Sequence, residues 1–199
     1  MSDLSARSGL ENVLARKTPH GATGVMGIVL ALRQDLALAS VMVRTGRIAE
    51  LARSCREKFD IELPLSPKRG RNGPVSLTWS GPGQWLAAME GETPEAFEDK
   101  LRNAFEALAS VSNQSDARTI LRVRGPKSRQ MLAKMIPLDL DPRSFPPGGT
   151  ALTIASHINV HFWLLDESPT FEFAVFRSLA VAFVDQLTEA SDEFGWTIE

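Results

Sequence analysis

Cysteine is nearly absent from the sequence. Cys55 is the single one among 199 residues, which excludes an internal disulfide framework. It lies in the segment RIAELARSCREKF, where helical spacing puts it on one face with Ile48, Leu51 and Phe59. A reactive thiol needs exposure and a lowered pKa. We therefore expect Cys55 to be a buried structural thiol in a protein suited to a reducing compartment.

An excess of charge of one sign is also missing. The net charge is −2 at pH 7 and the isoelectric point is near 6.0, so the chain offers no broad cationic field to a phosphate backbone. Nucleic acid is therefore not expected as a partner. One small basic cluster, Lys68, Arg69 and Arg71, falls in a Pro/Gly-rich stretch, and we interpret it as a solvated loop.

A membrane-spanning run is missing as well, because the apolar segment GVMGIVLAL is far too short to cross a bilayer. A basic head precedes this segment and ALAS follows it, which resembles a signal-peptidase site. Arg33 and Asp35 interrupt that pattern. We expect a cytoplasmic protein without a membrane partner, and a mature N-terminus at Ser40 would overturn this expectation.

Nucleotide-binding signatures do not occur, neither G-x-x-x-x-G-K-[ST] nor G-x-G-x-x-G. The nearest candidate is ILRVRGPKSRQML, where a strand pattern passes through Gly125 and Pro126 into a helix carrying Lys127 and Arg129. A helix start offers free backbone N–H groups to an anion, but proline has none to donate. Since proline also suits the first helical turn, we favour a plain strand-to-helix corner over an anion-binding turn.

His157 and His161, in HINVH, are the candidates for a metal site, and Asp166 and Glu167 follow them. Four residues along a strand separate Cα atoms by about 13 Å, too far for both imidazoles to bind one ion without strain. We favour a polar or interface face for this strand and keep a metal-dependent enzyme as the weakest hypothesis. The opposite, core face would consist of Ile158, Val160, Phe162 and Leu164.

Nucleophilic catalysis has weak candidates in Ser112 and Ser115, because no G-x-S-x-G elbow is present. Asp116 and Arg118 could orient a ligand, yet Asn, Ser and Asp between two strands are ordinary turn formers, which we favour. The sequence therefore predicts no catalytic, cofactor-binding or metal-binding residues in this chain. It predicts a folded module that acts through something else.

Tryptophan offers a different kind of signal. Trp79, Trp85 and Trp163 fall on predicted strands, where aromatic side chains fill a core or mark a contact surface. Phenylalanine already fills the apolar stripes, so at least one of these tryptophans is expected to face a partner.

Apolar periodicity predicts the order of the elements. The predicted strands are Val25–Leu32, Leu36–Val43, Val75–Ser80, Trp85–Met89, Leu108–Val111, Thr119–Arg124, Ala151–Ala155, Ile158–Leu165 and Phe171–Phe176. The predicted helices begin at Gly46 and Pro94 and span Pro126–Met135 and Ser178–Phe194. The first two strands are separated by three polar residues, so they are predicted to pair as a hairpin.

The domain organisation follows from this order. Residues 1–22 form a polar tail expected to be extended or partly disordered, and residues 23–199 are expected to form a single globular domain. Both halves follow the order strand, helix, strands, helix, which resembles two pseudo-repeated split β-α-β (ferredoxin-like) units. Alternating strands favour an α+β fold over a doubly wound parallel sheet.

Four stretches carry a family resemblance. They are LALASVMVRTGRIAELARSCREKFDIELPLSPKR, SLTWSGPGQWLAA, LRVRGPKSRQMLAKMIPLDLDPRSFPPGGTALT and FEFAVFRSLAVAFVDQLTEASDEFG. Their order and spacing resemble the gamma subunit of heterotetrameric sarcosine oxidase. The block Leu138–Phe145 and the pair Arg177-Ser178 make the resemblance fairly specific. Gln84 and Asn113-Gln114 depart from the family pattern, which weakens any claim that those positions carry chemistry.

The resemblance implies a fold like the folate-binding domain of aminomethyltransferases. It also implies a four-subunit flavoenzyme that oxidatively demethylates sarcosine to glycine, produces hydrogen peroxide and passes the one-carbon unit to tetrahydrofolate. FAD, FMN, NAD and tetrahydrofolate would then belong to the partner subunits, and the gamma chain would hold no cofactor of its own. The expected partners are the alpha, beta and delta subunits, chiefly alpha.

Two functions remain open. The leading hypothesis is a non-catalytic subunit that docks on the alpha chain, with the N-terminal tail and the loop Phe145–Gly149 as the expected contact surface. The alternative is a free-standing folate-binding or one-carbon-transfer protein with Asp116, Arg118 and Arg122 as its polar contacts.

Overall fold

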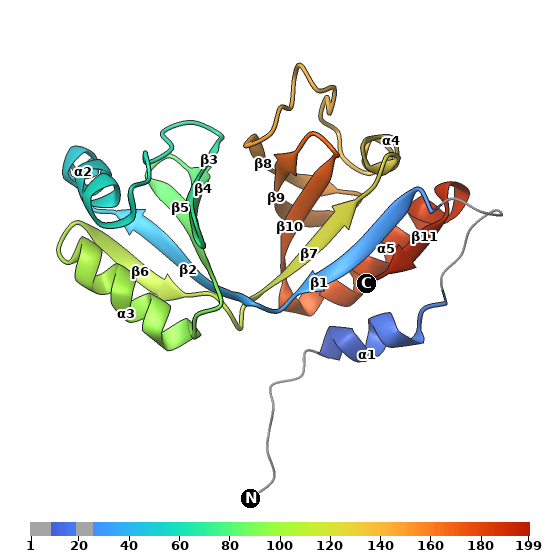
Figure 1. Ribbon diagram of the computed structural model, residues 1–199, viewed down its shortest axis with the longest axis horizontal. Helices are drawn as coiled ribbons and strands as arrows, with labels where there is room; N and C mark the ends of the chain where they lie inside the picture. The colour runs from blue at the N-terminus through green and yellow to red at the C-terminus, as the bar shows by residue number, and fades with distance from the viewer. Residues whose placement is uncertain (1–8, 19–25) are drawn as a thin grey trace, which may run out of the picture.

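Two antiparallel-rich sheets form the two lobes of the chain (Figure 1). The computed structural model describes residues 9–18 and 26–199. The five-stranded sheet has the order β3 (Arg69–Asn72), β4 (Val75–Gly81), β5 (Gln84–Glu90), β2 (Leu36–Val43) and β6 (Ala109–Asn113). Helices α2 (Ile48–Phe59) and α3 (Pro94–Phe105) pack on its outer face.

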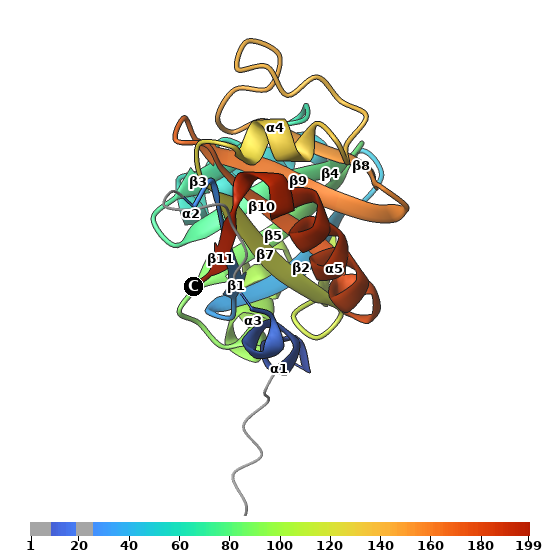
Figure 2. The ribbon, with the colours of Figure 1, turned by 90° about the vertical axis from the view of Figure 1, so that its right-hand side faces the viewer.

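The six-stranded sheet forms the other lobe. Its order is β11 (Trp196–Ile198), β1 (Ile28–Arg33), β7 (Arg118–Arg124), β10 (Thr170–Phe176), β9 (Ile158–Asp166) and β8 (Thr150–Ala155). Its helices are α1 (Gly9–Arg16), α4 (Ser128–Leu132) and α5 (Ala180–Ser191), with single 3₁₀ turns η1 (Arg177–Leu179) and η2 (Asp192–Phe194) flanking α5. Figure 2 shows α4 and α5 on the outward side of this sheet.

Each sheet has one face buried under helices and the other turned towards its partner sheet. In β2, Ala37, Ala39 and Val41 pack with the helical core, while Leu38 faces the other sheet. This is the period of two that a pleated strand imposes. Local sequence also determines where α3 begins, since the Thr93 hydroxyl accepts the Ala96 N–H at 3.3 Å and Pro94 is the first helical residue.

The two lobes repeat one topology. The first runs β2-α2-β4-β5-α3-β6, with the strand order β4-β5-β2-β6. The second runs β7-α4-β9-β10-α5, with the matching order β9-β10-β7 and then β1 in the place that β6 holds in the first lobe. These are two split β-α-β units, which confirms the predicted α+β fold.

The predicted hairpin between the first two strands is wrong. β1 pairs antiparallel with β7 and parallel with β11, whereas β2 pairs with β5 and β6 in the other sheet. The short connection between them therefore crosses from one lobe to the other, as does the link from β6 to β7 (Figure 1). Two alternating strands joined by a short polar link give the same sequence pattern whether they form a hairpin or cross between two sheets. The sequence therefore could not distinguish the two arrangements.

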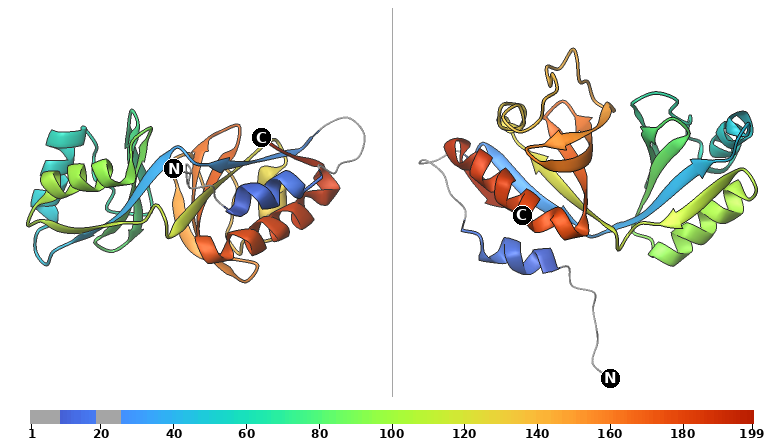
Figure 3. Two further views of the ribbon diagram at one scale, coloured as in Figure 1. Left: turned by 90° about the horizontal axis from the view of Figure 1, so that it is seen from below. Right: turned by 180° about the vertical axis from the view of Figure 1, so that it is seen from behind.

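The N-terminal segment contains a helix. Leu10 and Leu14 of α1 are buried in the core of the six-stranded lobe, and Lys17 contacts Asp185 at 2.8 Å and Thr188 at 3.1 Å on α5. Viewed from below, α1 lies beside α5 (Figure 3). The described part of the predicted tail is thus helical rather than extended, while residues 1–8 and 19–25 lie outside the described residues.

Three elements differ from the sequence prediction. β3 falls inside the Pro/Gly-rich stretch interpreted as a solvated loop, and β11 follows the predicted helix Ser178–Phe194. α4 covers only Ser128–Leu132, shorter than the predicted helix. β3, with the sequence RGRN, has no apolar side chain, and β11 has only three residues, too few for alternation to indicate a strand. Within the described residues, no helix combines the length and apolar content needed to cross a bilayer.

Candidate functional site

The two sheets meet through a small apolar cluster, which we call the inter-sheet cluster. Its buried members are Leu38, Leu86, Ala88, Ile120, Trp163 and Ala174. They come from β2 and β5 on one side and from β7, β9 and β10 on the other. Polar and charged side chains surround the cluster, and these are the candidates for function.

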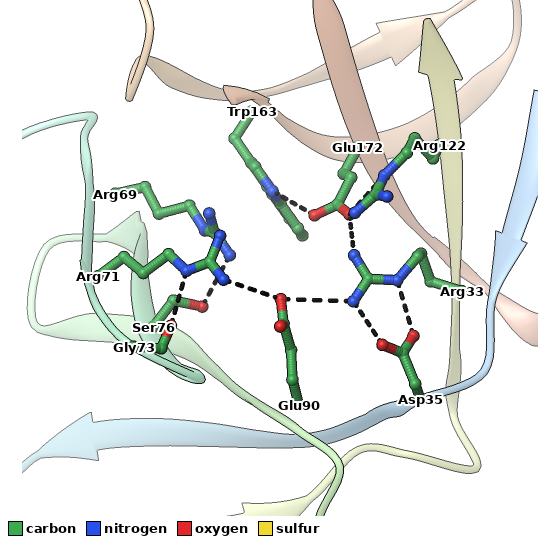
Figure 4. Close-up of polar contacts among 10 residues, drawn as sticks. All are labelled: Arg33, Asp35, Arg69, Arg71, Gly73, Ser76, Glu90, Arg122, Trp163 and Glu172. Carbon is green, nitrogen blue, oxygen red and sulfur yellow. Dashed lines mark hydrogen bonds and ion pairs between the residues drawn. The ribbon is translucent and has the colours of Figure 1, made fainter. Parts of the chain in front are cut away.

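Glu172 is the most buried of these charged groups. Its side chain is 2% exposed, and one carboxylate oxygen accepts N–H groups from Arg33 and Arg122 at 2.7 Å each. The other oxygen accepts the indole N–H of Trp163 at 2.9 Å. Figure 4 shows these groups converging between the lobes. A buried carboxylate with two cations and a neutral donor has its hydrogen-bonding capacity well satisfied.

Arg33 extends this arrangement to the crossing between the lobes. It donates two hydrogen bonds of 2.7 Å to the Asp35 carboxylate and lies 3.4 Å from Glu90. Arg71 reaches the same Glu90 at 3.2 Å (Figure 4). Hydrogen bonding to Asp35 raises the pKa of Arg33, and the same contact lowers the pKa of Asp35.

Arg69 completes what we call the Glu172 network, in which four guanidinium groups accompany three carboxylates. Its members are Arg33, Asp35, Arg69, Arg71, Glu90, Arg122, Trp163 and Glu172. Arg69 donates to the Ser76 hydroxyl at 3.0 Å and lies 5.7 Å from the centre of the Trp163 ring. Burial lowers its pKa to about 10, against the opposing effect of Glu172. The basic cluster predicted as a solvated loop is therefore partly buried at Arg69.

Arg118 lies beyond Ile120 from this network, on the same face of β7 as Arg122. Its guanidinium stands over the Phe176 ring, 4.8 Å from the ring centre, and its Nε atom is buried with no hydrogen-bond partner among the described residues. Burial lowers its pKa. Arg118, His161, Phe176 and β8 line a cavity of about 360 Å³, which we call the Arg118 cavity.

The three polar residues of the folate-binding alternative do not converge. Asp116 and Arg118 line one cavity of about 270 Å³ at the crossing between the lobes, together with Arg177. Asp116 is fully exposed and lies 3.5 Å from Arg177. Arg122 instead belongs to the Glu172 network. The two nucleophile candidates are also apart, since Ser112 is exposed while the Ser115 hydroxyl accepts the Leu38 N–H at 2.9 Å.

The two candidate histidine ligands lie in different environments. His157 is exposed in the turn before β9, whereas His161 is 3% exposed. The ring Nε2 of His161 lies 2.9 Å from the Thr150 hydroxyl and 3.0 Å from the Trp79 carbonyl. Burial lowers the pKa of His161 to about 4, with a smaller contribution from Arg118. The described part of the chain holds no group of three or more His, Cys, Asp or Glu residues placed to bind a metal.

The core face predicted for β9 is confirmed, because Ile158, Val160, Phe162 and Leu164 are all buried. The interpretation of Cys55 is confirmed as well. It has no exposed surface, and burial raises the pKa of its thiol to about 12, which leaves it a thiol at neutral pH.

The Gly125-Pro126 corner is a structural turn. The Lys127 N–H donates to the Gly27 carbonyl at 3.2 Å, and the Arg129 guanidinium donates to the carbonyls of Leu140 and Phe145. A side chain on Gly125 would collide with the Gly27 carbonyl, and its φ of 125° excludes most other residues. The groups that could have held an anion are therefore used within the fold, as we expected of a corner.

The expected contact loop Phe145–Gly149 is buried only at its first residue. Phe145 is 8% exposed and stacks on Phe162 with ring centres 5.0 Å apart, so the expectation of an exposed aromatic there is wrong. Trp85 and Trp163 are buried and Trp79 is half-buried, so none presents a fully open face. Pro146 and Pro147 are exposed and line a cavity of about 450 Å³ with Lys68 and Arg69.

Sequence reasoning missed most of the Glu172 network. One signal was available, since Glu172 stands between Phe171 and Phe173 in the apolar strand TFEFAVF. A carboxylate in such a strand indicates a buried ion pair. Its partners gave no comparable signal, because Arg33 comes from the six-stranded sheet whereas Arg69 and Glu90 come from the five-stranded sheet, and only the fold brings them together.

Comparison with known sequences identifies the family of this chain. The family described as sarcosine oxidase, gamma subunit, matches residues 45–193. The sarcosine oxidase subunit gamma of Corynebacterium sp. (strain U-96) is 30% identical over 141 residues, which cover 69% of this chain. The match spans 65% of that relative's length, slightly less than two thirds.

Two solved structures share the fold. The heterotetrameric sarcosine oxidase from Corynebacterium sp. U-96, in complex with pyrrole 2-carboxylate, contains a chain that matches with a TM-score of 0.81 and 23% identity, over 94% of this chain and 95% of that one. The glycine cleavage system aminomethyltransferase T from Bartonella henselae matches with a TM-score of 0.63 and 13% identity, over 87% of this chain and 48% of that one. The family match over residues 45–193 shows that this chain belongs to the sarcosine oxidase gamma subunit family.

Proposed function

We propose that this chain is a non-catalytic subunit of a heterotetrameric sarcosine oxidase and that it supports assembly of the complex. The family match over residues 45–193 carries the proposal. The structural match to a chain of a heterotetrameric sarcosine oxidase supports it, since that match extends over 94% of this chain. The partners would be the alpha, beta and delta subunits, with alpha as the main contact.

The chemistry of the most buried polar groups is compatible with this role. Glu172 is held by two guanidinium groups and an indole N–H, His161 contacts a hydroxyl and a carbonyl oxygen, and Cys55 is a fully buried thiol. A general base or nucleophile needs access to a reacting atom, which these positions do not provide. These groups serve the fold: the contacts of Glu172 lie within the six-stranded sheet, Cys55 lies in the core of the five-stranded lobe, and His161 links the lobes through the Trp79 carbonyl.

The reaction of the complex is part of the same proposal. It would oxidatively demethylate sarcosine to glycine, produce hydrogen peroxide and transfer the one-carbon unit to tetrahydrofolate. FAD, FMN, NAD and tetrahydrofolate would bind to the partner subunits. The gamma chain would contribute the surface on which those subunits are ordered.

We further propose that the complex works in the cytoplasm. A free thiol at Cys55 suits a reducing compartment. Cleavage between Ala39 and Ser40, within the signal-like ALAS segment, would divide β2, whose residues Ala39 and Val41 lie in the core of the five-stranded lobe. Determination of the mature N-terminus tests this point, and a chain that begins at Ser40 would contradict it.

Co-expression tests the proposed function. The chain is expressed with its alpha, beta and delta partners, and the assembled complex and its turnover of sarcosine are measured with and without it. We expect loss of the chain to reduce the yield of assembled complex and its stability. A complex that forms equally well and keeps full, stable activity without the chain would contradict an assembly role.

Titration of the isolated chain with tetrahydrofolate separates this proposal from the alternative. A non-catalytic subunit should show no saturable binding by calorimetry. A free-standing folate-binding protein should show stoichiometric binding that weakens when Asp116 or Arg118 is replaced.

A further inference from the structure

Arg118 differs from the partly buried Arg33, Arg69 and Arg122 because it has neither an ion pair nor a side-chain hydrogen bond within the described residues. Arg33 and Arg122 contact Glu172 at 2.7 Å, but Arg118 forms no ion pair and no side-chain hydrogen bond within the described part of the chain. Arg69 also forms no ion pair, yet it donates to Ser76 and Glu172 acts on it electrostatically. Only burial shifts the pKa of Arg118. A cation withdrawn from water without a partner destabilises the free chain.

The guanidinium is nevertheless held in a fixed place. It stands over the Phe176 ring at 4.8 Å, which orients its plane and leaves its N–H donors for another group. Besides the cavity of about 270 Å³ at the crossing between the lobes, two further cavities share it. One is the Arg118 cavity of about 360 Å³ on the six-stranded lobe, and the other, of about 80 Å³, lies against β2 and β5 of the five-stranded lobe.

Large apolar side chains surround these cavities and are open to solvent. Leu152 is 51% exposed and Phe176 is 45% exposed, and both line the Arg118 cavity. Met42 is 52% exposed and lines the smaller one. Ile154, 49% exposed, follows Leu152 along β8, which is the edge strand of its sheet. Exposed apolar side chains gathered around a polar centre are typical of protein contact surfaces.

We propose that the Arg118 cavity receives an acidic side chain of a partner polypeptide, whose neighbouring apolar residues cover Leu152, Phe176 and Met42. The inference rests on the proposed function, because it gives that subunit a docking point. A carboxylate matches the two parallel N–H donors that a guanidinium offers. A partner segment, rather than a small anion, is indicated because the apolar side chains extend across both lobes, beyond the reach of one carboxylate.

A competition experiment in the assembled complex tests the docking point. Wild-type chain and one variant, carrying different tags, are co-expressed with the alpha, beta and delta subunits, and their ratio in the purified complex is measured by mass spectrometry. Arg118→Met keeps the packing on Phe176 and removes the charge. We expect wild type to exceed Arg118→Met about 30-fold or more, and to exceed Arg118→Glu by a larger factor.

Arg53→Glu is the matched control. Arg53 is exposed on α2, on the outer face of the five-stranded lobe, and takes part in no ion pair among the described residues. The variant makes the same change of charge as Arg118→Glu at a distance from the cavity, and we expect it to enter the complex as wild type does. Thermal melting of each isolated variant shows whether it is folded. If Arg118→Glu is unfolded, its poor incorporation says nothing about docking, and the result for Arg118→Met tests the inference instead.

Zero-length cross-linking identifies the acidic group directly. In the complex formed with Arg118→Lys, a carbodiimide should join the introduced amine to an Asp or Glu of a partner subunit, and peptide mapping locates the bond. Wild-type chain provides the control, since a guanidinium does not couple in this way.

The outcomes separate the inference from the proposed function. If wild type does not enter the complex, the proposed function is contradicted. If wild type enters and Arg118→Met and Arg118→Glu enter equally well, the docking inference alone is overturned. Saturable binding of acetate or citrate to the isolated wild-type chain, lost in Arg118→Met, would also overturn it by assigning the cavity to a small anion.

Discussion

The partly buried arginines on the two sides of Ile120 have opposite surroundings. On one side, Arg33 and Arg122 converge on Glu172, and every member of this group is bonded within the chain. On the other side, Arg118 stands over Phe176 without a carboxylate and opens onto exposed apolar side chains. Arginine side chains in this region therefore have two different roles. The paired cations hold Glu172 within the six-stranded sheet, and the unpaired one remains available to a partner.

This difference has an energetic consequence. Removing one partner of a buried ion pair leaves a charge without compensation, which destabilises the fold. Removing a cation that has no partner removes an uncompensated charge, so the change does not destabilise the fold and can weaken only the binding of a partner. Mutations on the two sides of Ile120 should therefore divide into those that alter stability and those that alter assembly.

The largest expected effect is that of Glu172→Gln. It leaves Arg33 and Arg122 near a neutral amide, and we expect the free energy of unfolding to fall by about 3–5 kcal/mol. Urea denaturation of the isolated chain measures this change. Glu62→Gln is the control, because Glu62 pairs with Arg56 on the surface with 77% of its side chain exposed, and its loss should have far less effect. Equal effects of the two variants would mean that the ion pairs of Glu172 stabilise the fold no more than a surface pair does.

Lowering the pH should reduce the free energy of unfolding through His161, which lines the Arg118 cavity. Burial holds the pKa of His161 at about 4, below the 6.5 of the unfolded chain. The unfolded state therefore binds the proton first, so this contribution is complete above pH 6.5 and is lost as the pH falls towards 4. The loss is about 3 kcal/mol from the size of this shift. Urea denaturation at several pH values should show a shallower slope over this range for His161→Gln, and an identical slope would contradict the assignment.

Arg122→Met and Arg118→Met make the comparison within one strand. Arg122→Met removes a charged hydrogen bond to Glu172, and we expect a loss of about 1–3 kcal/mol of unfolding free energy. Arg118→Met should leave the isolated chain within about 1 kcal/mol of wild type or make it more stable. Both are measured by urea denaturation. A larger loss for Arg118→Met than for Arg122→Met would remove the distinction between the two sides.

The sequence predicted the local elements well because their causes are local. Thr93 and Pro94 begin α3, and alternation places Ile158 and Phe162 in the core, so no knowledge of the other lobe is needed. The crossing between β1 and β2 depends on which sheet each strand joins, and a single strand pattern does not contain that information. The predicted hairpin was wrong for this reason.

The candidate site was likewise predictable only in part. Glu172 could have been noticed from its apolar neighbours, and Arg118 was named as a polar contact from its place between two predicted strands. Their different environments could not be predicted, since Arg33 reaches Glu172 only through the pairing of β1 with β7 and β10 with β7. The charge balance around each arginine is a property of the assembled sheets.

Hydrogen exchange of the chain, alone and in its complex, tests the contrast most directly. Assembly should protect amides of β8 and of the segment Phe176–Leu179, next to the Arg118 cavity, and leave Arg69–Asn72 beside the Glu172 network unchanged. Protection confined to Arg69–Asn72, or no change in β8, would contradict the account.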